Sequence, residues 1–203
     1  MRNKALTQQR LLAAVGQVLT ESGFSGLGVN AVAKIAGVDK VLIYRYFGDF
    51  EGLCRAYAES SDFWPTVAEL IDDEVEFLTL PLEQRLILVS QQFSLAMRSR
   101  PLTLELLVWE LSERNAFIIE LERVRELFGI QLTELINRDL PTKSPAGELD
   151  WPAIMALIGA ATQYLALRAR HINTYNGVEI GSDEGWQRLD RTIEMLVNTL
   201  VRK

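Results

Sequence analysis

The chain has 203 residues, of which 48% are hydrophobic and 24% are charged, and it contains one cysteine and one histidine. A fold of this length buries about 70% of the surface of its unfolded chain, so its core needs no disulfide or structural metal. A single cysteine, Cys54, excludes an internal disulfide, and a single histidine, His171, excludes a Cys/His zinc cluster. The formal net charge of −6 argues at first sight against a nucleic-acid partner.

The N-terminal segment has two interpretations, because basic residues precede the apolar run 11–19 as they do in a signal peptide. Gln17 interrupts that run, and no small-residue cleavage site follows it. The same residues fit an amphipathic helix that ends at Gly23. No apolar run approaches the roughly 20 residues that a membrane span requires. We therefore expect a cytoplasmic protein with no membrane partner.

Apolar residues recur in steps of three or four along nearly the whole chain, and no comparable segment alternates as a half-buried strand does. Prolines stand mostly where a helix begins or has just ended. The pattern predicts an all-α fold with loops at 142–149 and 176–185. About nine helices are expected, over residues 6–22, 28–36, 40–47, 50–63, 82–99, 102–113, 115–138, 151–175 and 184–202.

Helix length and charge both divide the chain near residue 47. The first 47 residues carry six basic and two acidic side chains, a balance of +4. The remaining residues carry 15 basic and 25 acidic side chains, a balance of −10. Such asymmetry points to nucleic-acid contact by the basic part. We expect one domain over residues 1–49 and a larger one over residues 50–203.

Residues 29–47, VNAVAKIAGVDKVLIYRYF, predict a helix-turn-helix. Gly37 supplies the left-handed turn that lets the second short helix cross the first steeply. Asp39 can cap the second helix by accepting hydrogen bonds from its free N–H groups. A motif of this kind places the N-terminal part of its second helix in the major groove of DNA.

The run G-F-x(7)-V-A-x-x-A-G-V-D-K-x-x-I-Y-R-Y-F-x-x-x-E-x-L, over residues 23–53, resembles the DNA-binding domain of the tetracycline-repressor (TetR) family. The detailed match covers about a quarter of the chain. The resemblance implies a homodimeric one-component transcriptional regulator, usually a repressor. It also implies a larger C-terminal domain that binds a small molecule and dimerises through its last two long helices.

The resemblance also assigns roles to residues of the second helix of the motif, the recognition helix. The groove-facing positions are Lys40, Val41, Leu42 and Arg45. The positions that usually reach phosphates are Tyr44 and Tyr46.

Physical chemistry gives each of these positions a function and an alternative. Arg45 could make a bidentate contact to guanine, and Val41 or Leu42 could pack against a thymine methyl. Lys40 and the tyrosine hydroxyls would contact the DNA backbone without reading its sequence. In the alternative, Val41 and Leu42 belong to the core and Tyr44 only packs.

Three positions depart from the family pattern. Gly28 stands where Ser or Thr usually begins the first helix of the motif, which removes a hydroxyl cap and an expected hydrogen bond to phosphate. Asp39 adds a negative charge near DNA, and Phe50 replaces a Lys that could neutralise a phosphate. Every phosphate that the protein fails to neutralise flattens the log–log salt dependence by about 0.9. We expect modest electrostatic affinity for DNA.

The rest of the chain offers no catalytic constellation, so we expect neither an enzyme nor a cofactor. The acidic run 72–74 lacks the glycine-punctuated loop of a calcium site and is interpreted as a solvated face or loop. His171 is expected on a polar helix surface rather than on a metal. A helical enzyme would need a paired acid and base that the sequence does not show.

Aromatic and apolar residues with scattered polar groups are the usual lining of a small-molecule pocket. The family pocket lies among the predicted helices that carry six such residues, and many of these can equally be ordinary core. The candidates are Phe93, Met97, Trp109, Glu110, Phe117 and Tyr164. If Glu110 faces inward, its carboxylate would favour a cationic ligand.

The last two predicted helices are candidates for the homodimer interface, within residues 151–175 and 184–202. The small residues Gly159, Ala160 and Ala161 would allow close helix approach. The apolar positions are Ile154, Leu157, Ile158, Leu165, Ile172, Leu189, Ile193, Leu196 and Leu200.

Ligand binding could act on DNA binding through the predicted helix 50–63, which joins the two domains. The alternative function is a helical dimeric small-molecule-binding or scaffold protein whose DNA binding is weakened, as Gly28, Asp39 and Phe50 suggest.

Overall fold

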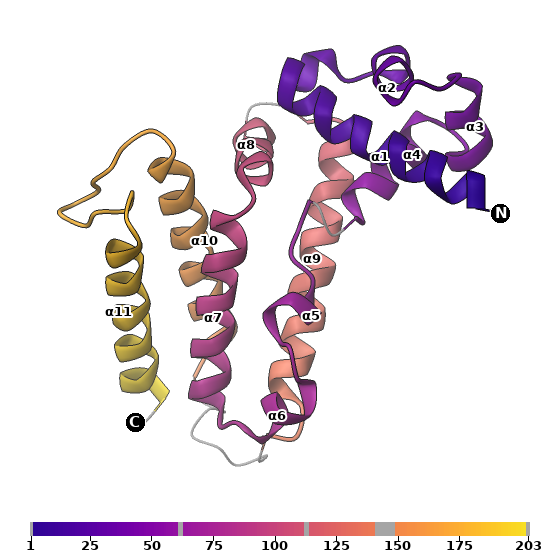
Figure 1. The fold of residues 1–203 in the computed structure, drawn as a ribbon. Coiled ribbons are helices and arrows are strands. Elements are labelled where there is room, and N and C mark those ends of the chain that lie inside the picture. The colour runs from indigo at the N-terminus through magenta and orange to yellow at the C-terminus, as the bar shows by residue number, and fades with distance from the viewer. Residues whose placement is uncertain (1, 61–62, 112–113, 141–148, 202–203) are drawn as a thin grey trace. The chain divides into compact units, whose positions relative to one another are not determined.

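The computed structural model describes residues 2–60, 63–111, 114–140 and 149–201, and its regular elements are helices (Figure 1). The predicted all-α fold is confirmed. The helices are α1 Arg2–Ser22, α2 Val29–Ala36, α3 Val41–Phe47, α4 Phe50–Ala58, α5 Val67–Leu70, α6 Glu74–Thr79, α7 Leu82–Arg98, α8 Pro101–Glu110, α9 Ala116–Asn137, α10 Trp151–Ala169 and α11 Asp183–Val201, with a 3-10 turn η1 at Phe24–Gly26.

Nine helices of seven or more residues, counted over the described residues, correspond to the nine predicted ones. The prediction missed α5 and α6, which are too short to show periodicity and depend on their caps. Thr66 and Glu69 form a capping box at the start of α5, and the Asp73 carboxylate accepts hydrogen bonds from two amides of α6. The predicted loop 142–149 lies mostly outside the described residues.

Three predicted helices end at least three residues earlier than expected, and one of them, predicted over 102–113, stops at Glu110. The predicted helix 50–63 stops at Ala58, where the Ser60 hydroxyl and amide both bond to the Tyr57 carbonyl. The predicted helix 151–175 stops at Ala169. After it, Asn176 and Gly177 take positive φ angles of 47° and 76° between the paired residues Tyr175 and Val178. Asn-Gly is a strong signal for such a tight turn, and this turn lies at the start of the predicted loop 176–185.

The chain forms two compact units. The first unit combines Met1–Trp64 with Glu105–Glu126, and the second combines Pro65–Leu104 with Leu127–Lys203. The first unit thus includes parts of α8 and α9 as well as the helix-turn-helix.

In the first unit, α1 packs against α2 and α4, and α3 packs against α4. The core side chains are aliphatic and come from all four helices, as the 3.6-residue period of each predicts. They include Leu11, Val15, Leu19, Val32, Ile43 and Leu53.

An aromatic cluster joins these helices to α8 and α9. Phe24 meets Trp109 edge to face at 6.0 Å between ring centroids and meets Phe117 at 5.5 Å. Tyr57 of α4 meets Phe117 at 6.2 Å. Such aromatic pairs contribute about 0.5–1.5 kcal/mol beyond the burial of their area. The cluster explains why residues 105–126 belong to the first unit.

Ion pairs reinforce the same junction between α4 and α9. Glu120 accepts from Arg123 at 2.8 Å and from Arg55 of α4 at 3.1 Å. Arg123 also pairs with Glu59, which follows α4, at 2.6 Å. The hydrogen bond from Arg123, together with that from Arg55, lowers the pKa of Glu120. Ion pairs with at least one exposed partner contribute only about 0–1 kcal/mol each, so their share in the stability of the junction is small.

The second unit is built around α7, which packs against α5, α10 and α11 (Figure 1). A buried guanidinium joins α7 to the ends of α6 and α9 in this unit. Arg85 of α7 is 1% exposed and donates to four backbone carbonyls. They belong to Leu78, Leu80, Ile136 and Arg138. One side chain thereby satisfies the C-terminal carbonyls of both α6 and α9.

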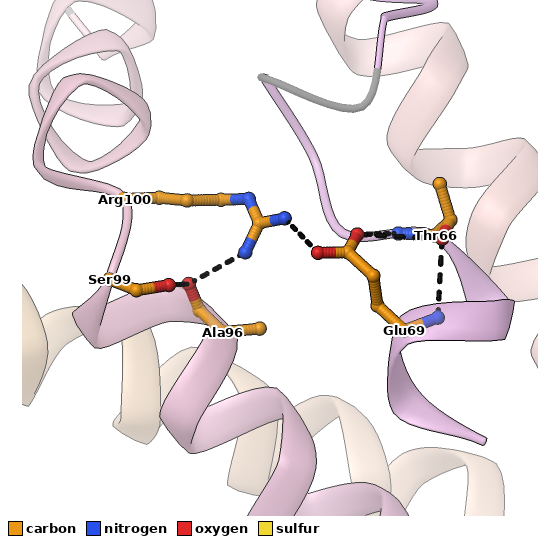
Figure 2. A network of polar contacts seen from close by, with 5 residues as sticks. All are labelled: Thr66, Glu69, Ala96, Ser99 and Arg100. Carbon is orange, nitrogen blue, oxygen red and sulfur yellow. Dashed lines mark hydrogen bonds and ion pairs between the residues drawn. The ribbon is translucent and has the colours of Figure 1, made fainter. Parts of the chain in front are cut away.

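A second arginine ties α5 to the end of α7 (Figure 2). Arg100 donates to the Ala96 carbonyl at 3.1 Å and pairs with Glu69. The other Glu69 oxygen accepts from the Thr66 amide at 2.8 Å in the α5 capping box. Burial would raise the pKa of Glu69, but the hydrogen bonds from Thr66 and Arg100 lower it. Among the helices of the described residues, none is long and apolar enough to cross a membrane.

Candidate nucleic-acid interface

The turn between α2 and α3 has the geometry that Gly37 predicts. Gly37 lies in the left-handed region at φ 61° and ψ 41°. Its amide donates to the Lys34 carbonyl at 3.2 Å, and the Val38 amide donates to the Ala33 carbonyl at 3.1 Å. These two bonds form a Schellman motif, which ends α2 and reverses the chain within a few residues. The turn therefore fixes where α3 starts.

Asp39 caps the start of the recognition helix, as predicted. Its Oδ1 accepts a hydrogen bond from the Val41 amide at 2.8 Å. The carboxylate satisfies an N–H group that has no partner inside the helix. Asp39 is therefore used structurally, although it still places a negative charge beside the groove-facing residues.

One face of α3 is anchored in the core and the other is exposed. Ile43 is fully buried, and Leu42 and Tyr46 are half-buried. Val41 is 56% exposed and Tyr44 is 50% exposed. Lys40 and Arg45 are exposed as well. The core interpretation of Val41 is wrong, because Ile43 takes the buried position.

Lys4 is a residue of this surface that sequence reasoning did not single out. Its Nζ lies 5.6 Å from the centre of the Tyr46 ring, within the range of a cation–π contact. The first turns of α1 thus place a positive charge beside the recognition helix. Lys4 and Tyr46 are 42 positions apart in the sequence, so only the tertiary fold reveals the pair.

The structure also shows what two of the family departures change. Gly28 is the N-cap of α2 and supplies no side-chain hydrogen bond. Its extended φ of −172° suits any residue, and a Cβ there would meet nothing within 4 Å. Phe50 begins α4 behind Asp49, whose Oδ1 caps the helix by accepting from the Gly52 amide at 2.6 Å. Neither departure disturbs the turn.

Comparison with known proteins identifies this part of the chain. Residues 11–57 match the family model of bacterial regulatory proteins of the tetR family. The helix-turn-helix belongs to a TetR-family domain.

The TetR-family domain has a relative in Mycobacterium tuberculosis, the uncharacterized HTH-type transcriptional regulator Rv1255c, which is 36% identical over 56 residues. That match covers 28% of this chain and 28% of the relative.

Solved structures extend the likeness of fold beyond the TetR-family domain. A Rhodococcus sp. protein described as a TetR-family transcriptional regulator superposes with a TM-score of 0.66 at 17% identity, covering 97% of this chain and 99% of its own. The transcriptional regulator FadR of Bacillus subtilis, solved in complex with stearoyl-CoA, gives a TM-score of 0.58 at 15% identity, covering 93% and 96%. At these identities the likeness concerns the fold alone.

Outside the TetR-family domain, the six predicted ligand residues fall into two groups. Trp109 and Phe117 meet around Phe24 in the first unit, next to Glu110. In the second unit, Phe93 and Met97 are buried on α7. Tyr164 of α10 is half exposed and meets the ring of Tyr175 edge to face at 5.7 Å. Their role in ligand binding stays a prediction.

Glu110 does face inward, but its charge is neutralised. Its side chain is 7% exposed and pairs with Arg125 of α9. The Arg125 guanidinium also lies over the ring of Trp64, 5.5 Å from its centre. The pairing removes the charge on which a preference for a cationic ligand depended.

Two cavities of the second unit lie elsewhere. The first has a volume of about 240 Å³ and is lined by α5, α6, α7 and the segments between them. The second has a volume of about 210 Å³ and is lined by α7, α8, α10 and the start of α11. The six predicted ligand residues are not among their lining residues. The acidic run 72–74 is exposed and serves partly as the cap of α6, and the described residues contain no cluster of three potential metal ligands. His171 is exposed, but it lies in a turn past the end of α10 rather than on the helix surface that was predicted.

The predicted dimer helices carry exposed apolar side chains. On α10, Leu157 is 73% exposed, and Ala160 and Ala161 are exposed beside it. On α11, Leu196 and Leu200 are exposed. These positions recur in steps of three or four, so on each helix they form one stripe. In the single chain these side chains stay exposed.

Proposed function

We propose that this chain is a transcriptional regulator that binds operator DNA as a homodimer and responds to a small-molecule effector. One observation carries the proposal: α3 is held by Ile43 while it exposes Lys40, Val41, Tyr44 and Arg45. An exposed valine and tyrosine add nothing to the core, whereas both suit contact with base edges and phosphates. The TetR-family domain around them supports the same function.

The exposed stripes of α10 and α11 support dimerisation. A two-fold axis through a four-helix bundle would cover Leu157, Leu196 and Leu200 and present two recognition helices. Such a dimer reads two half-sites of a palindrome, about 34 Å or a multiple of it apart. Occupation of a promoter by the dimer would block transcription without further machinery, which favours repression.

The Glu110–Arg125 ion pair and the aromatic residues near it support an apolar effector. An apolar ligand that binds beside Glu110 would not leave an unpaired carboxylate buried, because Arg125 already neutralises it. Stearoyl-CoA, which the FadR relative of similar fold binds, is the first effector to test. The effector must favour the DNA-incompetent state, because equal affinity for both states shifts nothing.

Selection of genomic DNA fragments on the purified protein tests the DNA-binding function. We expect enrichment of fragments that share a palindrome, and a loss of affinity of at least about tenfold in Arg45→Ala, because a bidentate base contact is removed. Arg114→Ala is the matched control, since it removes an exposed arginine of the same unit. Enrichment of no sequence would instead support the scaffold alternative.

The effector part is tested on the selected fragment. The Kd for that fragment is measured with and without stearoyl-CoA, and with a short-chain acyl-CoA as a control for the nucleotide. A weaker Kd with the long chain alone supports an apolar effector. Equal Kd values in all three conditions exclude acyl-CoA as the effector.

A further inference from the structure

Arg10 of α1 is an exposed residue whose guanidinium folds back onto the helix-turn-helix. Its Nη2 donates to the Ala36 carbonyl at 2.5 Å and, at 3.4 Å, to the Gly37 carbonyl. Ala36 is the last residue of α2, and Gly37 is the left-handed turn residue. The sequence places Arg10 among the basic residues of the N-terminal part but gives no sign of this contact.

The chemistry of a helix end explains why a guanidinium belongs there. The last four carbonyls of a helix have no partner inside it, and together they carry partial negative charge. The Schellman bonds use the Ala33 and Lys34 carbonyls. Arg10 donates to the next carbonyls along the chain, those of Ala36 and Gly37. Because the donor is charged, such a bond is stronger than one between neutral groups.

The guanidinium also occupies the space over the turn. A Cβ placed on Gly37 would lie 3.0 Å from Arg10 Nη2. Gly37 is therefore required for its positive φ, and a side chain there would push against the end of the Arg10 guanidinium. Arg10 thus ties the middle of α1 to the end of α2 and to the turn that precedes α3.

We propose that Arg10 is a positioning residue that sets the orientation of α3, and that it does not neutralise a DNA phosphate. The assignment rests on the proposed DNA-binding function. Base contacts tolerate little error in the placement of a recognition helix, and only Val38, Asp39 and Lys40 separate Gly37 from α3. Of the basic side chains in the first 47 residues, Arg10 is thus assigned to the protein rather than to DNA.

The first test needs no DNA. Amide hydrogen exchange of Gly37 and Val38 is measured in the full-length wild type, in Arg10→Met and in Arg10→Lys. We expect exchange about tenfold faster in Arg10→Met, because removal of a hydrogen bond to a charged group loosens the turn. Arg10→Lys can keep one bond and should recover part of the protection. Unchanged exchange in Arg10→Met would show that Arg10 does not stabilise the turn, whether or not the protein binds DNA.

The second test separates positioning from phosphate contact by salt dependence. Kd is measured over a range of KCl concentrations for the selected genomic fragment and for a random-sequence duplex of the same length. Arg10→Met should weaken binding of the selected fragment about tenfold and leave the slope of log Kd against log salt unchanged. Lys40→Met is the control, and it should reduce that slope by about 0.9 because it removes a phosphate contact.

The outcomes separate the two proposals. A slope reduced by about 0.9 in Arg10→Met would make Arg10 a phosphate contact and overturn the assignment. Equal weakening of the random duplex would also overturn it, because a misplaced helix impairs base recognition and not general attraction. If the wild type enriches no fragment, the proposed function fails. The exchange experiment still decides whether Arg10 stabilises the turn.

Discussion

Single residues at the helix-turn-helix have opposite conformational requirements, and glycine shows this most clearly. Gly28 and Gly37 flank α2, one at its N-cap and one just past its end. Gly28 is extended and has open space around its Cα, whereas Gly37 has a positive φ and faces Arg10. The same substitution should therefore have opposite effects at the two positions.

Gly28→Ser should stabilise the protein by a few tenths of a kcal/mol, roughly 0.3, because a serine hydroxyl can accept from a free amide of α2. It should also strengthen DNA binding, since Ser stands at this position in the family pattern. Urea unfolding measures the first effect, and titration with the selected fragment measures the second.

Gly37→Ser is the matched control. It should cost about 1–2 kcal/mol, because an L-residue is strained in the left-handed region and its Cβ displaces Arg10. If both substitutions destabilise the protein equally, the N-cap of α2 is not the open position that the structure shows.

At the scale of elements, helix ends are held by side chains that come from distant parts of the chain. Arg85 serves the ends of α6 and α9, and Arg10 serves the end of α2. Arg100 links the cap of α5 to the end of α7. In each case a guanidinium, with five donors in a planar fork, satisfies more than one acceptor at once.

Arg85→Met should destabilise the protein by about 3 kcal/mol, because buried carbonyls of two helices lose charge-assisted hydrogen bonds that water cannot replace. Arg85→Lys keeps the charge but reaches fewer carbonyls, so it should recover only part of the loss. The free energy of unfolding in urea is the measurement. Arg188→Met is the control, since Arg188 is exposed and donates to the single carbonyl of Gly177. A cost below about 1 kcal/mol for Arg85→Met would show that the two helix ends do not depend on this side chain.

At the scale of the whole molecule, the net charge of −6 is an average of two different parts. A balance of +4 over the first 47 residues allows contact with phosphate, while the −10 of the remainder discourages non-specific wrapping of DNA. Contact with DNA is thereby restricted to the part of the chain that carries α3. Two such parts are needed to read a palindrome, so DNA binding and dimerisation are linked in the proposed function.

Leu157→Glu should disrupt the dimer, because it places a charge in the centre of the exposed stripe of α10. Light scattering should give twice the chain mass of 22.9 kDa for the wild type and the chain mass for the variant. The affinity of the variant for the selected fragment should fall as well, because two linked helix-turn-helix domains bind more tightly than one. Val75→Glu on α6, equally exposed, is the control and should remain dimeric. A monomeric wild type would refute the proposed interface.

The fold class, the nine longer helices and the turn at Gly37 follow from the sequence alone, because their causes are local. A helix repeats every 3.6 residues, and a cap or Schellman turn acts within about six. The local signals that prediction missed were short ones: the capping box of α5 and the Asp73 cap of α6. They outweigh periodicity only where the helix is too short to show it or where it must end.

Contacts between distant positions were decided only by the tertiary structure. Arg10 lies 26 positions from the carbonyl that it binds, and Arg85 lies 51 positions from Ile136. Phe24 meets Trp109, and Lys4 lies beside Tyr46. A charged side chain has the same local sequence signature whether it faces solvent, a phosphate or a helix end, because its partner is chosen by packing. The sequence therefore determined that a basic helix-turn-helix is present, and the tertiary structure decided which of its basic side chains remain available to DNA.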